Sequence, residues 1–257
     1  MRSIVVTSGK GGVGKTTLVA LLGKELARQG KRVVVVDLDF GLNNLDMLFR
    51  AEHRVFYDLS DVIEGRCRLK QALLTDETQP NLLLLPSKKA YLSQAITGQK
   101  IRAVMHQLKP YADFVLVDSP AGMDLGFHRA MQTADEAIVV VTPSPLAVRD
   151  ADKVLAMMRS YGMQSARLVV NRVRGELVAD GEMLPPESLS KLLKARLLGA
   201  VGEEECLLLS KKPSPTLKKA VKLLATSLIS DKEKIYDATK AYRGFWGSIR
   251  RKIKRSV

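Results

Sequence analysis

Residues 4–17 read Ile4-Val5-Val6-Thr7-Ser8-Gly9-Lys10-Gly11-Gly12-Val13-Gly14-Lys15-Thr16-Thr17 and determine the fold of this chain. A short β-branched run leads into a glycine-rich turn, which opens a helical pattern over Thr16–Gln29. Strand, glycine loop and helix in that order are the context of a phosphate-binding loop. Glycines let consecutive backbone N–H groups turn toward an anion, and the helix dipole adds to the attraction. The sequence therefore predicts a nucleotide phosphate site.

Further short apolar runs recur along the chain, at spacings that leave room for helices between them. They are Arg32–Asp37, Leu82–Leu85, Phe114–Asp118, Ala137–Thr142 and Leu168–Asn171. Near-continuous apolar runs of this length are typical of strands that are buried on both faces. The alternation predicts an α/β fold with a doubly wound, mostly parallel sheet and helices on both faces.

Composition excludes several classes of protein. The two cysteines, Cys67 and Cys206, are isolated, and no histidine lies at metal-ligand spacing from them, so we expect a reduced, cytosolic protein without zinc. No apolar run is long enough for a membrane-spanning helix, and no signal peptide precedes the first strand. The net charge of +14 predicts a polyanionic partner, either nucleic acid or an anionic lipid surface.

Each position of the loop has a chemical reason. Lys15 is expected to reach the β- and γ-phosphates, and the Thr16 hydroxyl to hold Mg²⁺. The predicted nucleotide contacts of the loop are Gly11, Gly12, Val13, Gly14, Lys15, Thr16 and Thr17. Carboxylates at the ends of neighbouring parallel strands, Asp37, Asp39 and Asp118, can compensate a metal and position water. For Asp37 and Asp39 the alternative is an ordinary aspartate that caps a turn.

Lys10-Gly11-Gly12-Val13-Gly14-Lys15-Thr16-Thr17 resembles the deviant Walker A motif of the MinD/ParA ATPase superfamily. The resemblance covers about residues 2–230 and implies a P-loop NTPase fold that hydrolyses ATP with Mg²⁺. It also implies that Lys10 reaches the nucleotide of a second copy across a face-to-face dimer, so that Lys10, Lys15 and Asp39 are the catalytic residues. Asp39 would orient the attacking water, and Asp37 would lie nearer the metal.

The segment Asp118-Ser119-Pro120-Ala121-Gly122 resembles the Walker B and switch II segment of MinD proteins. Asp118 would then join Thr16 and Asp37 at the metal, and Gly122 would offer its N–H near the γ-phosphate. Two positions depart from the family pattern: Asn43 stands where arginine is frequent, and Gly202 where proline is usual.

The adenine base needs a group that both donates and accepts hydrogen bonds, as an amide does. By family position that group is Asn171, with Arg172 beside it, at the end of the run Leu168–Asn171. An ordinary turn asparagine is the alternative.

The C-terminal segment carries half of the net charge, because seven basic residues and no acidic one follow Asp237. We expect an ATPase domain over residues 1–230 and a helical tail over residues 231–257, which ends in an amphipathic helix over about residues 242–257. At helical spacing, one face would carry Phe245, Trp246, Ile249 and Ile253, and the basic residues Arg250, Arg251, Lys252 and Lys254 lie outside it.

Bulky apolar residues opposite lysine and arginine suit a helix in an anionic membrane interface. The alternative is a helix that packs its apolar stripe on the domain. Gly244 and Gly247 weaken an isolated helix, which favours one that forms on meeting lipid.

The resemblance implies a slow, partner-stimulated ATPase that dimerises with ATP and positions the division septum by recruiting an inhibitor of MinC type. A regulator of MinE type would stimulate hydrolysis, and Val148–Asp152 resembles the start of the partner-docking helix. We expect a cytoplasmic protein, peripheral on the inner face of the cell membrane, with no nucleic-acid partner. The alternatives are a flagellar-number regulator of FlhG type and a ParA-like DNA-partition ATPase.

Overall fold

The computed structural model describes residues 1–40, 44–87, 96–163, 165–204 and 213–255, with the backbone alone for residues 252–255. One sheet runs through the molecule in the strand order β3-β4-β2-β5-β1-β6-β7-β8. Its strands are β1 (Arg2–Thr7), β2 (Val33–Asp37), β3 (Leu74–Thr75), β4 (Leu82–Leu85), β5 (Phe114–Asp118), β6 (Glu136–Val141), β7 (Ala166–Val173) and β8 (Arg196–Gly202). Neighbours are parallel except β3 and β4, so the predicted doubly wound sheet is confirmed.

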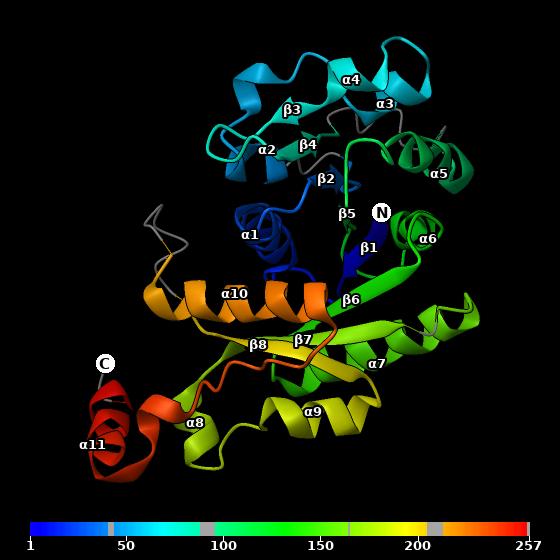
Figure 1. Ribbon diagram of the computed structural model, residues 1–257. Coiled ribbons are helices and arrows are strands. Elements are labelled where there is room, and N and C mark those ends of the chain that lie inside the picture. Colours follow the sequence, from blue (N-terminus) through cyan, green and yellow to red (C-terminus); the bar gives the residue numbers. More distant parts are fainter. Residues whose placement is uncertain (41–43, 88–95, 164, 205–212, 256–257) are drawn as a thin grey trace.

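The helices cover both faces of this sheet (Figure 1). They are α1 (Lys15–Arg28), α2 (Asn44–Leu48), α3 (Leu59–Ile63), α4 (Leu69–Ala72), α5 (Gly98–Gln107), α6 (Leu125–Met131), α7 (Pro145–Ser160), α8 (Gly175–Ala179), α9 (Pro186–Leu193), α10 (Pro215–Ser230) and α11 (Gly244–Arg255), with 3₁₀ turns η1 (Glu52–Arg54) and η4 (Lys240–Tyr242). Helices α1 and α10 pack on one face, and α5, α6, α7 and α9 on the other.

Strand β2 shows why its sequence reads as an unbroken apolar run. Val33 and Val35 pack in the core under α1 and α10, whereas Val34 and Val36 pack in the opposite core. Both sets are fully buried. A central parallel strand has no polar face because helices cover it from both sides.

Two strands, β3 and β8, were not predicted from the sequence. β3 is only two residues long, and β8 contains Gly199 and Ala200 instead of a β-branched run. A Cβ added at Gly199 would lie 2.5 Å from Leu224 of α10. Gly199 thus lets Leu224 of α10 pack close to β8, and glycine at this position weakens the sequence signal for a strand.

The expectation of a helical tail over residues 231–257 is wrong for its first part. Asp231, with φ of 52°, ends α10, and residues 231–239 form no helix. Helical structure resumes at η4 and then α11, so the amphipathic helix spans Gly244–Arg255. The intervening segment packs on the body, with Ile235 and Ala238 against one core and Tyr236 against the other.

Candidate functional site: a nucleotide cleft at the strand ends

The glycine loop lies between β1 and α1, at the carboxyl edge of the sheet. Gly12 and Gly14 adopt φ of 76° and 89°, which residues with a side chain rarely adopt. A Cβ at Gly12 would meet no atom within 4 Å. The loop lines a hollow of about 1080 Å³ together with Ser8 and Asp39. Residues Lys10 to Thr17 all contribute to its wall. The loop is therefore shaped as an open cradle whose backbone faces free space.

Lys15 lies at the floor of this cradle. Its Nζ donates to Asp118 Oδ1 at 2.6 Å and lies 3.4 Å from the Thr16 hydroxyl. Both members of the ion pair are buried, so an arriving phosphate meets an ammonium group already held in position. Burial raises the pKa of Asp118, while the charge of Lys15 opposes that shift.

Asp37 lies beside Asp118, because the two residues pair in register at the ends of β2 and β5. Its carboxylate Oδ1 accepts a hydrogen bond of 2.8 Å from the Asp39 backbone. Burial and then the neighbouring Asp118 raise the pKa of Asp37 well above its usual value. Burial also raises the pKa of Asp39, which is half-buried and faces the hollow.

This arrangement fits magnesium held with a nucleotide. Among the described residues, no three His, Cys, Asp or Glu side chains form a metal-binding group by themselves. Mg²⁺ in nucleotide sites is held by one or two carboxylates together with substrate phosphates and water. Thr16, Asp118 and Asp37 would supply the protein part of that shell, and the ion would neutralise charge between the phosphates.

Lys10 is exposed, whereas Lys15 is buried. The Lys10 carbonyl accepts a hydrogen bond of 3.0 Å from the Ser8 hydroxyl. The Gly122 N–H, predicted near the γ-phosphate, donates instead to the Ser8 carbonyl at 3.1 Å. Gly122 thus ties the segment after β5 to the base of the loop.

Gly9 brings α7 against the loop, which sequence reasoning did not detect. A Cβ at Gly9 would lie 2.5 Å from the backbone of Asp150. Asp150 belongs to the segment Val148–Asp152, which occupies the first turns of α7. The predicted partner-docking segment therefore packs directly on the phosphate loop.

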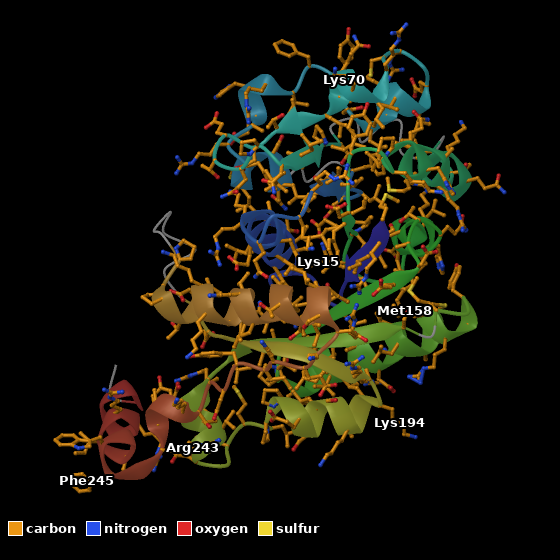
Figure 2. The ribbon with its side chains drawn as sticks, viewed as in Figure 1. Lys15, Lys70, Met158, Lys194, Arg243 and Phe245 are labelled. Carbon is orange, nitrogen blue, oxygen red and sulfur yellow. The ribbon has the colours of Figure 1, made fainter. Side chains whose placement is uncertain are left out.

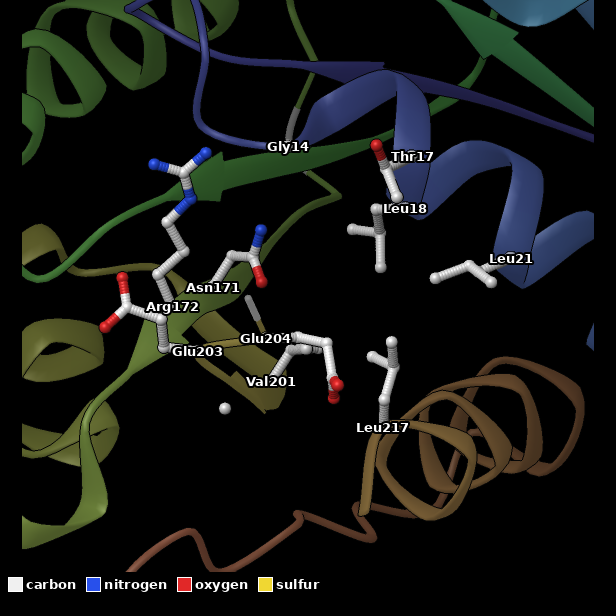
Figure 3. A pocket seen from close by; sticks show the side chains of 11 residues that line it. Gly14, Thr17, Leu18, Leu21, Asn171, Arg172, Val201, Glu203, Glu204 and Leu217 are labelled. Atoms are coloured by element: carbon white, nitrogen blue, oxygen red, sulfur yellow. The ribbon is translucent and has the colours of Figure 1, made fainter. Parts of the chain in front are cut away.

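A cavity of about 170 Å³ lies behind the loop (Figure 3). Asn171 and Arg172, the residues predicted to contact the base, border it from the end of β7, and Arg172 has φ of 57°. The Asn171 side chain donates to the Val13 carbonyl at 2.7 Å. This bond uses one of the two amide N–H donors, so the second N–H and the amide oxygen remain for a ligand.

The same cavity contains wall residues that the sequence analysis missed. Leu18, Leu21 and Leu217 form its apolar side, Gly202 ends β8, and Glu203 and Glu204 follow that strand. Recognising β8 as a strand would have placed these residues at the same sheet edge as Asn171. Asn43, the other departure from the family pattern, lies outside the described residues.

Helix α11 carries its apolar side chains outward. Phe245 and Trp246 are 77% and 75% exposed, and Ile249 is 39% exposed. Figure 2 shows Phe245 projecting away from the body at the end of the molecule. Arg250 is exposed, Arg251 is partly covered, and the side chains of Lys252, Ile253 and Lys254 lie outside the described residues. For the described residues, the alternative of an apolar stripe packed on the domain is wrong.

Comparison with known proteins gives the family. A family model described as an AAA domain matches residues 1–167. The septum site-determining protein MinD of Synechocystis is 43% identical over 209 residues, which are 81% of this chain and 79% of that protein. The chain belongs to the MinD family.

Solved structures of MinD proteins have the same fold as this chain. The MinC:MinD cell division complex of Aquifex aeolicus contains a chain that is 38% identical, with a TM-score of 0.82 over 90% of this chain and 97% of that chain. MinD of Pyrococcus horikoshii in complex with Mg-ADP is 28% identical, with a TM-score of 0.77 over 88% of this chain and 95% of that chain.

As a MinD-family protein, the chain is an ATPase that uses ATP and Mg²⁺. The comparisons do not favour the flagellar-number and DNA-partition alternatives. No helix among the described residues has the length and apolarity needed to cross a bilayer.

Proposed function

We propose that the chain is an ATP-dependent dimerising ATPase that binds the inner face of the cell membrane and positions the division septum by recruiting an inhibitor of MinC type. The observation that carries this proposal is the pairing of an exposed Lys10 at the nucleotide loop with an outward-facing apolar surface on α11. The first is suited to sensing a second copy, and the second to an anionic bilayer.

The hydrolytic step uses residues that the fold brings to one sheet edge. Lys15 and the loop N–H groups bind the phosphates, and Asp39 orients a water molecule for attack on the γ-phosphorus, which releases ADP and phosphate. Bound Mg²⁺ stabilises the charge that develops on the phosphate oxygens. Because no side chain besides Asp39 is assigned to the water, we expect slow turnover until a partner completes the site.

Dimerisation gives ATP control over membrane residence. Lys10 reaches the nucleotide of the second copy, so the face-to-face dimer forms when ATP is bound. One amphipathic helix binds lipid marginally, whereas two helices on one dimer bind with the avidity of a high effective concentration. Hydrolysis then returns the chain to the cytoplasm.

The proposed binding site for both protein partners lies on α7. The complex of the Aquifex relative shows MinC with MinD, and the segment Val148–Asp152 touches the phosphate loop at Gly9. We propose that an inhibitor of MinC type and a regulator of MinE type dock there, where docking can reach the nucleotide. Substituting the exposed Asp152 by alanine is expected to weaken inhibitor binding in a fluorescence titration without changing ATP affinity.

Vesicle sedimentation tests the membrane switch. The wild-type chain is expected to sediment with phosphatidylglycerol-containing vesicles in ATP and to remain in the supernatant in ADP. Lys10→Ala should bind ATP but lose ATP-dependent sedimentation, and removal of residues 244–257 should abolish sedimentation. Lys109→Ala, which removes the same charge from an exposed site elsewhere, is the control. Equal sedimentation of the wild type in ATP and ADP would refute the switch.

The hydrolytic assignment has a separate test. Asp39→Asn keeps the size of the side chain but weakens its ability to orient and accept a proton from water, so turnover should fall about 100-fold or more. ATP affinity should change little, and the ATP dimer should persist in light scattering after size exclusion. An unchanged turnover number would remove Asp39 from the catalytic role.

A further inference from the structure

The segment that joins α10 to α11 is held along the body. Glu233 forms an ion pair with Arg196 at 2.9 Å, and the Lys234 backbone donates to the Ser227 hydroxyl at 3.0 Å. Ile235 and Ala238 pack against the main core. The chain therefore arrives at η4 in a fixed position and not as a free tether.

Three contacts then join α8, the segment that ends in η4, and α11, and we name them the tail clasp. A Cβ at Gly175 of α8 would lie 2.0 Å from the Ala238 carbonyl oxygen and 3.0 Å from the Tyr242 ring. A Cβ at Gly247 of α11 would lie 2.2 Å from the Tyr242 carbonyl carbon. Arg251 forms an ion pair with Asp180 at 2.9 Å and donates to the Tyr242 carbonyl.

The tail clasp fixes which face of α11 points outward. Gly247 and Arg251 are four residues apart and lie on one helical face, which is the face in contact with the body. Phe245 and Ile249 lie on the opposite face and are exposed. The apolar residues are thus presented to the outside by contacts on the other side of the same helix.

We propose that the tail clasp holds the lipid-binding helix preformed and in one orientation on the ATPase body, so that a bilayer meets a rigid surface instead of a free tail. The docking of α11 stands on the contacts alone, whereas its consequence for lipid binding rests on the proposed membrane association. Gly244 and Gly247 weaken an isolated helix, and helices of this length are marginal in water. Packing of Gly247 on Tyr242 would supply the stability that the local sequence does not give to this helix.

Gly175→Ala tests the clasp without altering any lipid-facing residue or the net charge. Gly175 has an ordinary φ, so alanine fits the backbone of α8, but its methyl group collides with Ala238. In the absence of lipid, we expect amide exchange in residues 244–251 to accelerate at least about tenfold, as for loss of a tertiary contact. The fluorescence anisotropy of Trp246, the only tryptophan of the chain, should fall.

Gly247→Ala gives the sharper comparison, because the two views of the tail predict opposite results. Alanine raises intrinsic helix propensity, so a tail that folds on its own would become more helical and bind lipid more tightly. If the clasp holds the helix, the new methyl group displaces α11 from Tyr242, and exchange in residues 244–251 accelerates. Ser188→Ala, an exposed change on α9, is the control for both variants.

Vesicle binding of the same variants measures how much the docking of α11 contributes to lipid affinity. Loss of preorganisation in Gly175→Ala is expected to weaken vesicle binding in ATP by about tenfold. Vesicle binding absent from the wild type, with slow exchange in residues 244–251, would overturn the membrane role but leave the docking intact. Fast wild-type exchange that neither glycine variant changes would overturn the clasp, whatever the vesicles show.

Discussion

Asn171 contacts both the phosphate loop and the cavity proposed for the base. Replacing it by alanine distinguishes the contributions of these two contacts to nucleotide binding. Its amide NH₂ group donates to the Val13 carbonyl of the phosphate loop, and its side chain borders the base cavity. The amide oxygen and the second amide N–H are left, and the oxygen can accept a hydrogen bond from the adenine amino group, where guanine has a carbonyl oxygen instead. Asn171→Ala therefore removes the hydrogen bond to the loop and, if Asn171 binds adenine as proposed, a second bond to the base.

The magnitudes follow from counting these bonds. A net hydrogen bond contributes about 1 kcal/mol, which is about fivefold in affinity. Tripolyphosphate lacks a base, so Asn171→Ala should weaken it only through the bond to Val13, by about fivefold. ATP should lose both bonds and weaken by about 25-fold, and the preference for ATP over GTP should shrink.

Isothermal titration with tripolyphosphate, ATP and GTP measures the three affinities. Asn81→Ala is the matched control, because Asn81 donates to the Ala27 and Lys31 carbonyls on a surface that does not line the nucleotide hollow. That variant should affect thermal stability and leave nucleotide affinity unchanged. Unchanged tripolyphosphate affinity in Asn171→Ala would refute the loop-shaping role, and an unchanged ATP to GTP ratio would refute base reading.

Three further predictions concern stability and the loop. The side-chain hydrogen bond from Arg2 lowers the pKa of Glu136, so this carboxylate stabilises the fold above its unfolded pKa and loses that effect as pH falls through its folded pKa. Glu136→Gln should lose about 1–3 kcal/mol of unfolding free energy at pH 7 in urea titrations, and less as the pH drops below the ordinary pKa of a glutamate side chain. Gly9→Ala should press against Asp150, destabilise the fold by about 1–3 kcal/mol and weaken ATP binding; unchanged ATP affinity would contradict the packing of α7 on the loop. Leu26→Ala, at a fully buried position of α1, should lower the unfolding free energy by about 2–5 kcal/mol in the same titrations.

The central strands and the phosphate loop were predictable because their signals are local. Val33–Val36 form a run that both cores bury, and the loop glycines mark positions of positive φ such as Gly12 and Gly14. Lys15 and Asp118 were predicted at one site because the carboxyl ends of parallel strands meet at one edge. Their direct ion pair was not predicted, because the strand register that brings them together is a tertiary property.

The positions that sequence reasoning missed are ones where a glycine serves a distant neighbour. Gly199 admits Leu224, Gly9 admits Asp150, and Gly247 admits Tyr242. In a single sequence each reads as a weak point in a strand, a member of the loop motif or a helix breaker. The partner that explains each glycine is far away in the sequence or lies in another element, and only the folded chain shows it.

Helix α8 lies between the cavity proposed for the base and the tail clasp. Arg172 borders the cavity, and three residues later Gly175 contacts Ala238 in the tail clasp. Between them Arg174 pairs with the buried Glu176 at 2.7 Å and approaches Glu203, a wall residue of the cavity, at 3.7 Å. The tail clasp is therefore built on the segment that follows the cavity lined by Asn171 and Arg172. If the base binds in this cavity as proposed, the β7–α8 connection would orient α11 relative to the nucleotide, which a free tether could not do.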